Sequence, residues 1–189
     1  MDKKLKIITT SFNDLFVIEP NKYEDERGSF SRVYCAEELK ELTSIDIKQI
    51  NHSFTKDKGT VRGMHFQYEP NCEVKIVKCI SGSILDVVVD IRKNSPTFLK
   101  YFSIKLTKEN QKMLYIPKGF AHGFQTLEDD TELLYMHSNI YTPSNEGALN
   151  VKDPLLGIKW LLDIKNLSKR DKEHKFLSTT FKGIDIDEL

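Results

Sequence analysis

Residues 74–91 read Val-Lys-Ile-Val-Lys-Cys-Ile-Ser-Gly-Ser-Ile-Leu-Asp-Val-Val-Val-Asp-Ile, two β-branched runs separated by a Ser-Gly-Ser break at 81–83. β-Branched residues favour strands, and a short glycine-containing break between two such runs is typical of a hairpin turn. Because side chains alternate along a strand, Lys75 would share one face of the first strand with Val77 and Cys79. The stretch therefore predicts paired strands, one of which carries a lysine that needs an anion if it is buried.

Similar runs recur through the middle of the chain at a spacing that suits short strands. Apolar or aromatic runs occupy residues 74–80, 84–91, 101–106, 113–116, 123–127 and 132–138. Breaks rich in turn-forming residues separate them, at 81–83, 94–96, 108–110, 117–119 and 128–130. This pattern predicts an all-β fold, either an antiparallel barrel or a sandwich.

Helices are expected only as short peripheral elements, at residues 36–42 and 168–174, the second of which starts from a serine N-cap. The 189 residues contain no repeat, no low-complexity tract and no flexible linker. We therefore expect a single domain over 1–189, with a barrel core at about 45–160 and a helical C-terminal segment at about 161–189.

Composition excludes several classes of partner. Lysine and arginine total 28, as do aspartate and glutamate, so no overall charge attracts nucleic acid or a membrane surface. The N-terminal apolar run is too short for a signal peptide, and no stretch reaches the roughly 18 apolar residues of a membrane span, which predicts a cytoplasmic protein. Cys35, Cys72 and Cys79 are odd in number and lack metal-ligand spacing, so we interpret them as reduced thiols.

The run Val-Arg-Gly-Met-His-Phe-Gln at 61–67 carries the most informative polar residues. In a regular strand, Arg62 and Met64 would face one way while Gly63 and His65 face the other, and the glycine would leave room beside the imidazole. Histidine has an unperturbed pKa of roughly 6.5, so it takes up and releases protons near neutrality. The run therefore predicts a pocket in which a proton is transferred.

A metal is the other common use of a histidine in a small β-barrel. Metal-binding barrels usually present His-x-His with a further carboxylate and histidine, but the residue two positions after His65 is Gln67. His122, in Gly-Phe-Ala-His-Gly-Phe at 119–124, is the partner that remains. The sequence therefore predicts no metal site.

Each candidate residue also has an ordinary structural explanation when it is taken alone. His65 can be a hydrogen-bonded core histidine, Lys75 a strand residue with its ammonium in water, Tyr135 a packed aromatic and Asp171 a helix charge. What favours a functional site is that a histidine, an arginine, a lysine and a tyrosine all fall within strand runs. Several polar groups that converge in a barrel mouth form a ligand site.

Ordered blocks along most of the chain resemble the deoxysugar-nucleotide epimerases typified by dTDP-4-dehydrorhamnose 3,5-epimerase. The blocks are residues 24–30, 49–53, 61–67, 86–92, 95–98, 116–124, 134–135, 153–160 and 167–171. The resemblance implies a cupin-type jelly-roll barrel without metal or other cofactor, which forms a homodimer with an N-terminal segment exchanged between subunits. It also implies a substrate that is a nucleotide-linked 4-keto-6-deoxy sugar.

In that family a 4-keto group makes the hydrogens on C3 and C5 removable. Epimerisation then needs a base, an acid on the opposite face and a group that stabilises the enolate oxygen. By resemblance, His65 is the base, oriented by Asp171, and Tyr135 is the acid. Lys75 corresponds to the lysine that stabilises the enolate, and Asp86 to a carboxylate near that centre.

The resemblance also assigns substrate-binding residues. Arg27, Gln49 and Arg62 match positions that bind the diphosphate, which suits guanidinium groups because they donate paired hydrogen bonds to phosphate oxygens. Phe30, Asn51 and His122 are assigned to the lining of the pocket.

Some positions depart from the family pattern. Arg32 replaces a carboxylate that helps to hold the nucleoside, Ile140 replaces a frequent aromatic residue next to Tyr141, and Met136 and His137 replace the residues usual after Leu-Tyr. Arg32 therefore remains a substrate-binding candidate with reversed charge. A GDP-linked 4-keto-heptose is an alternative substrate, and inversion at C3 alone is an alternative outcome. A 3,4-ketoisomerase and a non-catalytic sugar-nucleotide-binding barrel are the competing functions.

Overall fold

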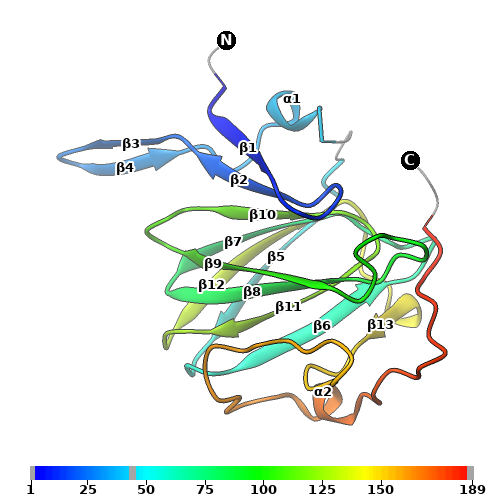
Figure 1. Cartoon of the computed structure of the whole chain (residues 1–189). Coiled ribbons are helices and arrows are strands. Elements are labelled where there is room, and N and C mark those ends of the chain that lie inside the picture. Colours follow the sequence, from blue (N-terminus) through cyan, green and yellow to red (C-terminus); the bar gives the residue numbers. More distant parts are fainter. Residues whose placement is uncertain (1–2, 43–45, 187–189) are drawn as a thin grey trace.

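The computed structural model describes residues 3–42 and 46–186. Two antiparallel sheets face each other (Figure 1). The strands of the six-stranded sheet lie in the order β1 (Leu5–Thr9), β2 (Phe16–Pro20), β10 (Met113–Ile116), β7 (Lys75–Ser81), β12 (Thr131–His137) and β5 (Gln49–Thr55). Those of the five-stranded sheet lie in the order β13 (Glu146–Ala148), β6 (Val61–Gln67), β11 (Phe120–Thr126), β8 (Ser83–Asp90) and β9 (Tyr101–Thr107). The predicted all-β class is confirmed.

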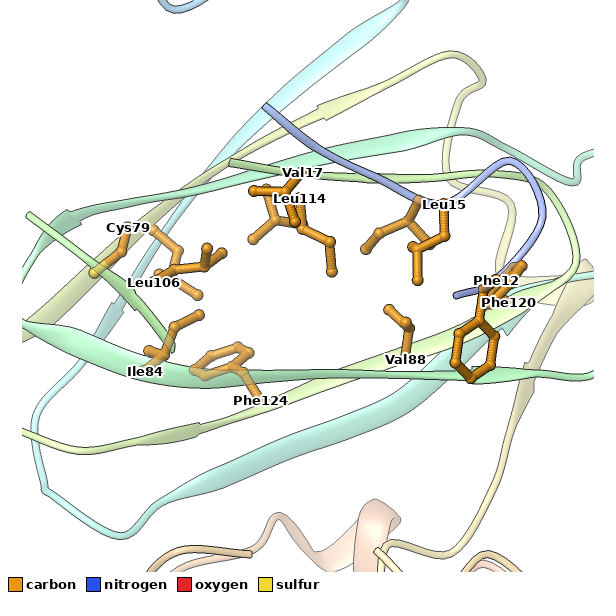
Figure 2. Close-up of a cluster of buried hydrophobic side chains, with 13 residues drawn as sticks. Phe12, Leu15, Val17, Cys79, Ile84, Val88, Leu106, Leu114, Phe120 and Phe124 are labelled. Atoms are coloured by element: carbon orange, nitrogen blue, oxygen red, sulfur yellow. The ribbon is translucent and has the colours of Figure 1, made fainter. Parts of the chain in front are cut away.

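The main core lies between the two sheets. Val17 and Leu114 from the six-stranded sheet meet Ile84, Val88 and Phe124 from the five-stranded sheet, and all five are buried (Figure 2). Burying one such side chain contributes about 1.5–3 kcal/mol, so this cluster is a large part of what holds the sheets together. Because this cluster holds the sheets together, the side chains at the other, polar end of the barrel do not need to be apolar.

The barrel begins earlier in the chain than the predicted core of residues 45–160. Strands β1 and β2 join the six-stranded sheet through the pairing of β2 with β10, in which Leu114 lies opposite Val17. These N-terminal strands lie outside residues 74–138, where the repeated runs were found, so they were not predicted. The chain then forms a separate two-stranded hairpin, β3 (Lys22–Asp25) and β4 (Gly28–Ser31), which projects away from the barrel (Figure 1).

The C-terminal segment is mostly irregular chain, so the prediction of a helical segment over 161–189 is wrong for the described part. Its helical portion is α2 (Lys169–Glu173), and Ser168 caps it as predicted by accepting a hydrogen bond from the Asp171 backbone N–H. Apolar side chains at irregular spacing, including Trp160 and Ile184, cover the outer face of the five-stranded sheet. A covering layer of this kind needs apolar contacts but no helical periodicity. Residues 187–189 lie outside the described part.

The other helical elements are short. Helix α1 (Ala36–Leu39) is shorter than the predicted 36–42, and a 3₁₀ turn, η1 (Pro143–Asn145), precedes β13. No helix in the described residues is long and apolar enough to cross a membrane.

An irregularity in β6 determines how its polar side chains are placed. His122 and Phe124 of β11 lie opposite His65 and Arg62, so two positions along β11 match three along β6. This is a β-bulge, and the extra residue reverses the alternation of side chains. The prediction that Arg62 and His65 face opposite ways is therefore wrong, because both line the same cavity. Met64 is buried in the apolar layer on the outer face of the five-stranded sheet.

Replacing Gly63 with alanine is expected to destabilise the protein by roughly 2–6 kcal/mol, because the new methyl group adds a clash to an unfavourable backbone conformation. Gly63 has a φ of +140°, and a Cβ there would lie 2.5 Å from the Cα of Gly123. Urea unfolding measures the change. Gly28→Ala is the matched control, because Gly28 has a φ of +129° with no atom within 4 Å of its Cβ position. Equal losses in the two variants would contradict the packing argument.

Candidate active site

A cavity of about 790 Å³ opens between the sheets, with residues of α2 along one side. This volume is within the usual range of pockets for small ligands. Eight of the twelve predicted site residues line the cavity: Gln49, Asn51, Arg62, His65, Lys75, His122, Tyr135 and Asp171. The other four, Arg27, Phe30, Arg32 and Asp86, do not.

His65 and Asp171 form a hydrogen-bonded pair, although they are 106 positions apart in the chain. Nε2 of His65 lies 2.8 Å from Oδ1 of Asp171, which is buried at the start of α2. Burial raises the pKa of Asp171, but the hydrogen bond and charge of His65, the contact with Ser168 and the charge of Arg170 outweigh it and hold the pKa below its usual value. Asp171 is therefore ionised near neutrality.

The carboxylate of Asp171 fixes the tautomer of the imidazole. An ionised carboxylate accepts only, so Nε2 of neutral His65 carries the proton that is donated to Asp171. This leaves the lone pair on Nδ1, for which no hydrogen-bond partner is found among residues 3–42 and 46–186. A histidine arranged in this way is a base that a carboxylate both orients and stabilises once it is protonated.

The lowered pKa of Asp171 links this pair to stability. A carboxyl group whose folded pKa is depressed stabilises the protein above its unfolded pKa, about 3.9, and loses that contribution as the pH falls through the folded value. We expect Asp171→Asn to have a lower Tm than the wild type at pH 7, and we expect the gap to close below about pH 4. Calorimetry across this range tests the expectation, and a gap independent of pH would contradict it.

Tyr135 lies on β12, in the opposite sheet from His65. Its hydroxyl is 3.2 Å from Oγ of Ser53, and its ring contacts the rings of His122 and His137. Burial raises the pKa of Tyr135, while the hydrogen bond with Ser53 opposes the shift. Tyr135 is therefore a protonated phenol near neutrality and is able to donate a proton into the cavity.

Lys75 is nearly buried, and Glu73 is its partner. The Lys75 ammonium lies 2.9 Å from Oε1 of Glu73, and the side chains of both are about one-tenth exposed or less. Burial raises the pKa of Glu73, but the nearby His137 ring, the charge and contact of Lys75 and the hydrogen bond from Gln67 hold it below its usual value. The lysine that the sequence placed on the inner face thus has an anion within the protein itself.

Asp86 does not line the cavity, in contrast to its assignment as a substrate-binding residue. It is fully buried on β8, and its Oδ1 lies 2.6 Å from Nε2 of His122 on the neighbouring strand β11. The paired strands hold His122 between Asp86 and the cavity. Asp86 therefore orients a residue of the cavity wall, and the carboxylate next to Lys75 is Glu73.

Arg27, Phe30 and Arg32 lie on or beside the β3–β4 hairpin, away from the cavity of their own chain. Arg27 pairs with Asp25 at 2.6 Å, Arg32 pairs with Glu38, and the Phe30 side chain is 72% exposed. Within one chain, the structure does not bring these three predicted residues to the site.

The cavity also contains polar residues that were not predicted as part of the site, among them Glu73, His137, Glu146 and Arg170. Strand alternation offered a signal for two of them, because Glu73 is two residues before Lys75 and His137 is two residues after Tyr135. Arg170 binds Glu146 through contacts of 2.7 and 3.1 Å and approaches Nε2 of His65 at 3.2 Å. No sequence pattern connected Glu146 to the site.

One group of side chains in the described residues has the proximity that a metal site needs. The ligand atoms of His65, Asp171 and His174 all lie within 4.8 Å of one another. The Arg170 guanidinium, 3.2 Å from the His65 ring nitrogen, places a fixed positive charge where a cation would bind. The donor set therefore fits a hydrogen-bonded His–Asp pair better than a metal centre.

A family model described as dTDP-4-dehydrorhamnose 3,5-epimerase matches residues 9–179. The chain belongs to the dTDP-4-dehydrorhamnose 3,5-epimerase family. The enzyme of that name from Salmonella typhimurium is 42% identical over 168 residues, which cover 87% of this chain and 91% of the relative. The expected family resemblance is confirmed.

Solved structures of the epimerase family share the fold. The Bacillus anthracis dTDP-4-dehydrorhamnose 3,5-epimerase with TDP and PPi bound has a TM-score of 0.89 and 36% identity, covering 92% of this chain and 99% of that one. A 3′-monoepimerase from Streptomyces bikiniensis in complex with dTDP-quinovose has a TM-score of 0.84 and 32% identity, covering 89% of this chain and 86% of that one. The predicted cupin-type jelly roll is confirmed.

Proposed function

We propose that this chain is an isomerase that inverts C3 and C5 of a dTDP-linked 4-keto-6-deoxyhexose. The observation that carries the proposal is that one cavity contains the His65–Asp171 pair together with Lys75 and Tyr135, which are both on the opposite sheet from His65. A base, an acid and a cation arranged around one space are the groups that this reaction needs. The names of the relatives supply the dTDP-linked substrate.

Proton transfer proceeds through the enolate. Nδ1 of His65 takes the proton from the carbon next to the ketone. The electron pair of the broken C–H bond forms a double bond to C4, and the π pair of the C=O bond moves to the C4 oxygen, where the Lys75 ammonium stabilises it. The Tyr135 phenol then donates its proton to the opposite face of the carbon. Each inversion leaves an imidazolium and a tyrosinate, and proton exchange with solvent restores both groups.

Arg62 provides a binding group for the diphosphate. Its guanidinium donates to Oγ1 of Thr55 at 3.1 Å and to the Phe54 carbonyl at 3.2 Å, which holds the side chain along the cavity wall. Five N–H donors are available on a guanidinium, so donors remain for phosphate oxygens. The β6 bulge places this group on the same strand face as His65.

The β3–β4 hairpin supports the proposal that the enzyme is a homodimer with exchanged N-terminal segments. Arg27 and Phe30 have no role in the cavity of their own chain, and the hairpin projects from the barrel (Figure 1). If the hairpin enters a partner's cavity, each active site combines the barrel of one subunit with Arg27 and Phe30 of the other.

Subunit mixing tests the exchange directly. We expect His65→Asn and Arg27→Ala to be inactive or weak as separate homodimers, and we expect a co-refolded mixture to regain activity. In the mixed dimer, one site combines an unmodified barrel with an unmodified hairpin. Failure to regain activity in dimers shown to be mixed would contradict exchange, and a monomer in light scattering would contradict the dimer.

The reaction is tested by incubating the protein with dTDP-4-keto-6-deoxyglucose in heavy water. We expect deuterium at C3 and C5 and an inverted product by NMR, with the GDP-linked analogue as a comparison of the nucleotide. Absence of exchange with every 4-keto sugar nucleotide would contradict the proposal. A product whose carbonyl has moved to C3 would show a ketoisomerase instead.

Inversion at C3 alone is the second candidate, because a 3′-monoepimerase is among the similar structures. The same incubation separates the two functions, since a C3-only enzyme labels C3 and leaves C5 unlabelled.

A further inference from the structure

Glu73 is buried and His137 is partly buried, and the mechanism above assigns no direct role to either of these titratable groups. His137 lies directly opposite Lys75 in the pairing of β12 with β7 and two residues from Tyr135 on the same strand. We propose that Glu73 and His137 form a subsite for the hydroxyl on C3, next to the ketone oxygen that Lys75 holds. This inference rests on the proposed function and identifies the substrate feature that the site recognises as an α-hydroxy ketone.

A chain of hydrogen bonds fixes the orientation of the His137 ring. The backbone N–H of Tyr141 donates to Oε1 of Gln49 at 3.0 Å, so the other end of the Gln49 amide, Nε2, donates to Oδ1 of Asn51 at 3.1 Å. Nδ2 of Asn51 therefore faces His137 and lies 3.4 Å from its Nε2. Because an amide nitrogen only donates, Nε2 of His137 is the acceptor and Nδ1 carries the proton.

That proton lies near a carboxylate that it does not reach. Nδ1 of His137 lies 3.9 Å from Oε1 of Glu73, which is beyond hydrogen-bond distance. The other carboxylate oxygen, Oε2, accepts from Gln67, and Oε1 also accepts from Lys75 at 2.9 Å. The Nδ1–H donor of His137 and the Oε1 acceptor of Glu73 thus lie close together beside the Lys75 ammonium without a hydrogen bond between them.

A hydroxyl group that lies to one side of the line between these two atoms can bond to both. An oxygen about 2.8 Å from each atom accepts from Nδ1 of His137 and donates to Oε1 of Glu73, within ordinary hydrogen-bond distances. Lys75, at the same carboxylate oxygen, then binds the neighbouring ketone oxygen. A hydroxyl and a carbonyl on adjacent carbons satisfy all three groups, whereas the methyl group on C5 satisfies none of them.

The subsite acts on one of the two inversions. When C3 loses its proton it becomes trigonal, and its hydroxyl enters the plane of the enolate beside the C4 oxygen. When C5 loses its proton, C3 stays tetrahedral and its hydroxyl does not change position relative to C4. His137 and Glu73 are therefore positioning residues whose loss slows exchange at C3 more than exchange at C5.

Two variants of His137 separate this role from ring packing. His137→Phe keeps the aromatic contact with Tyr135 but removes the N–H, while His137→Asn removes the ring and presents an amide N–H near the position of Nδ1. In heavy water we expect His137→Phe to lower the ratio of C3 to C5 exchange by about 10-fold to 100-fold, the effect of one hydrogen bond to a charged or reacting group. We expect His137→Asn to keep the ratio within about 3-fold of the wild type.

Each outcome bears on the inference. Equal slowing at C3 and C5 in His137→Phe, or a larger loss in His137→Asn than in His137→Phe, would overturn the subsite and leave the epimerase proposal standing. Absence of exchange in the unmodified protein would overturn both. Glu73→Leu gives a second measure if His137→Phe does not fold, because it also lowers the C3 to C5 ratio. A 3-deoxy substrate should exchange at C5 equally well with His137→Phe and with the wild type.

Discussion

Exchange of substrate hydrogen with solvent should fall by about 10²-fold to 10⁴-fold when His65 is replaced with asparagine, which is the usual contribution of a general base. Asparagine is smaller than the ring that it replaces, and its amide ends near the position of Nδ1, so the basic nitrogen is lost together with the contact between Nε2 and Asp171. Mass spectrometry of the sugar nucleotide after incubation in heavy water measures the rate. Loss is expected at C3 and C5 together, because one imidazole serves both carbons.

The control for this variant is His52→Asn. His52 also lines the cavity, but its exposed ring pairs with Glu132 at 2.8 Å, and Glu132 is not a lining residue. Exchange in the control should stay near the wild-type rate. If His65→Asn retained full exchange while folded, another group would be the base.

Tyr135→Phe should separate proton removal from inversion. The base is intact in this variant, so exchange is expected to continue from the His65 face, while formation of the inverted product falls by about 10²-fold to 10⁴-fold. The partly buried phenol holds its proton because desolvation raises the pKa of Tyr135, and phenylalanine has no such proton to donate. NMR distinguishes labelled substrate of unchanged configuration from inverted product.

Tyr101→Phe is the matched control, since the Tyr101 hydroxyl accepts a hydrogen bond from the Lys159 backbone outside the cavity. Rapid inversion by Tyr135→Phe would assign the acid to another residue or to water. Equal loss of exchange and inversion would show that the phenol also has a role in binding.

Strand periodicity predicted the part of the fold that repeats regularly. The runs around Lys75 and Val88 alternate or are continuously apolar between clear turns, and both are strands in the structure. Strands β1 and β2 were not predicted; they pair with each other, and β2 joins the sheet through β10, which is almost one hundred residues away in the sequence. The covering C-terminal segment has no period to detect.

The family resemblance predicted site residues that lie far apart in the sequence. It did not predict features of the site that depend on local backbone geometry. Nothing local connects His65 to Asp171, and only the family blocks suggested the pair that the structure shows. Arg62 was assigned to the wrong face because a bulge depends on the partner strand, which the sequence of β6 does not specify. Glu73 was missed because its partner Lys75 was matched with Asp86 instead.

The single extra residue in β6 has a consequence for substrate range. Arg62 and His65 lie three residues apart on one strand. The backbone of the sheet, more than the flexible side chains, therefore sets the distance between the group that binds the diphosphate and the base that deprotonates the carbon. A sugar nucleotide whose keto group lay one bond further from the diphosphate would present the wrong carbon to the imidazole. The register of β6 against β11 thus determines which carbon of the substrate lies at the imidazole.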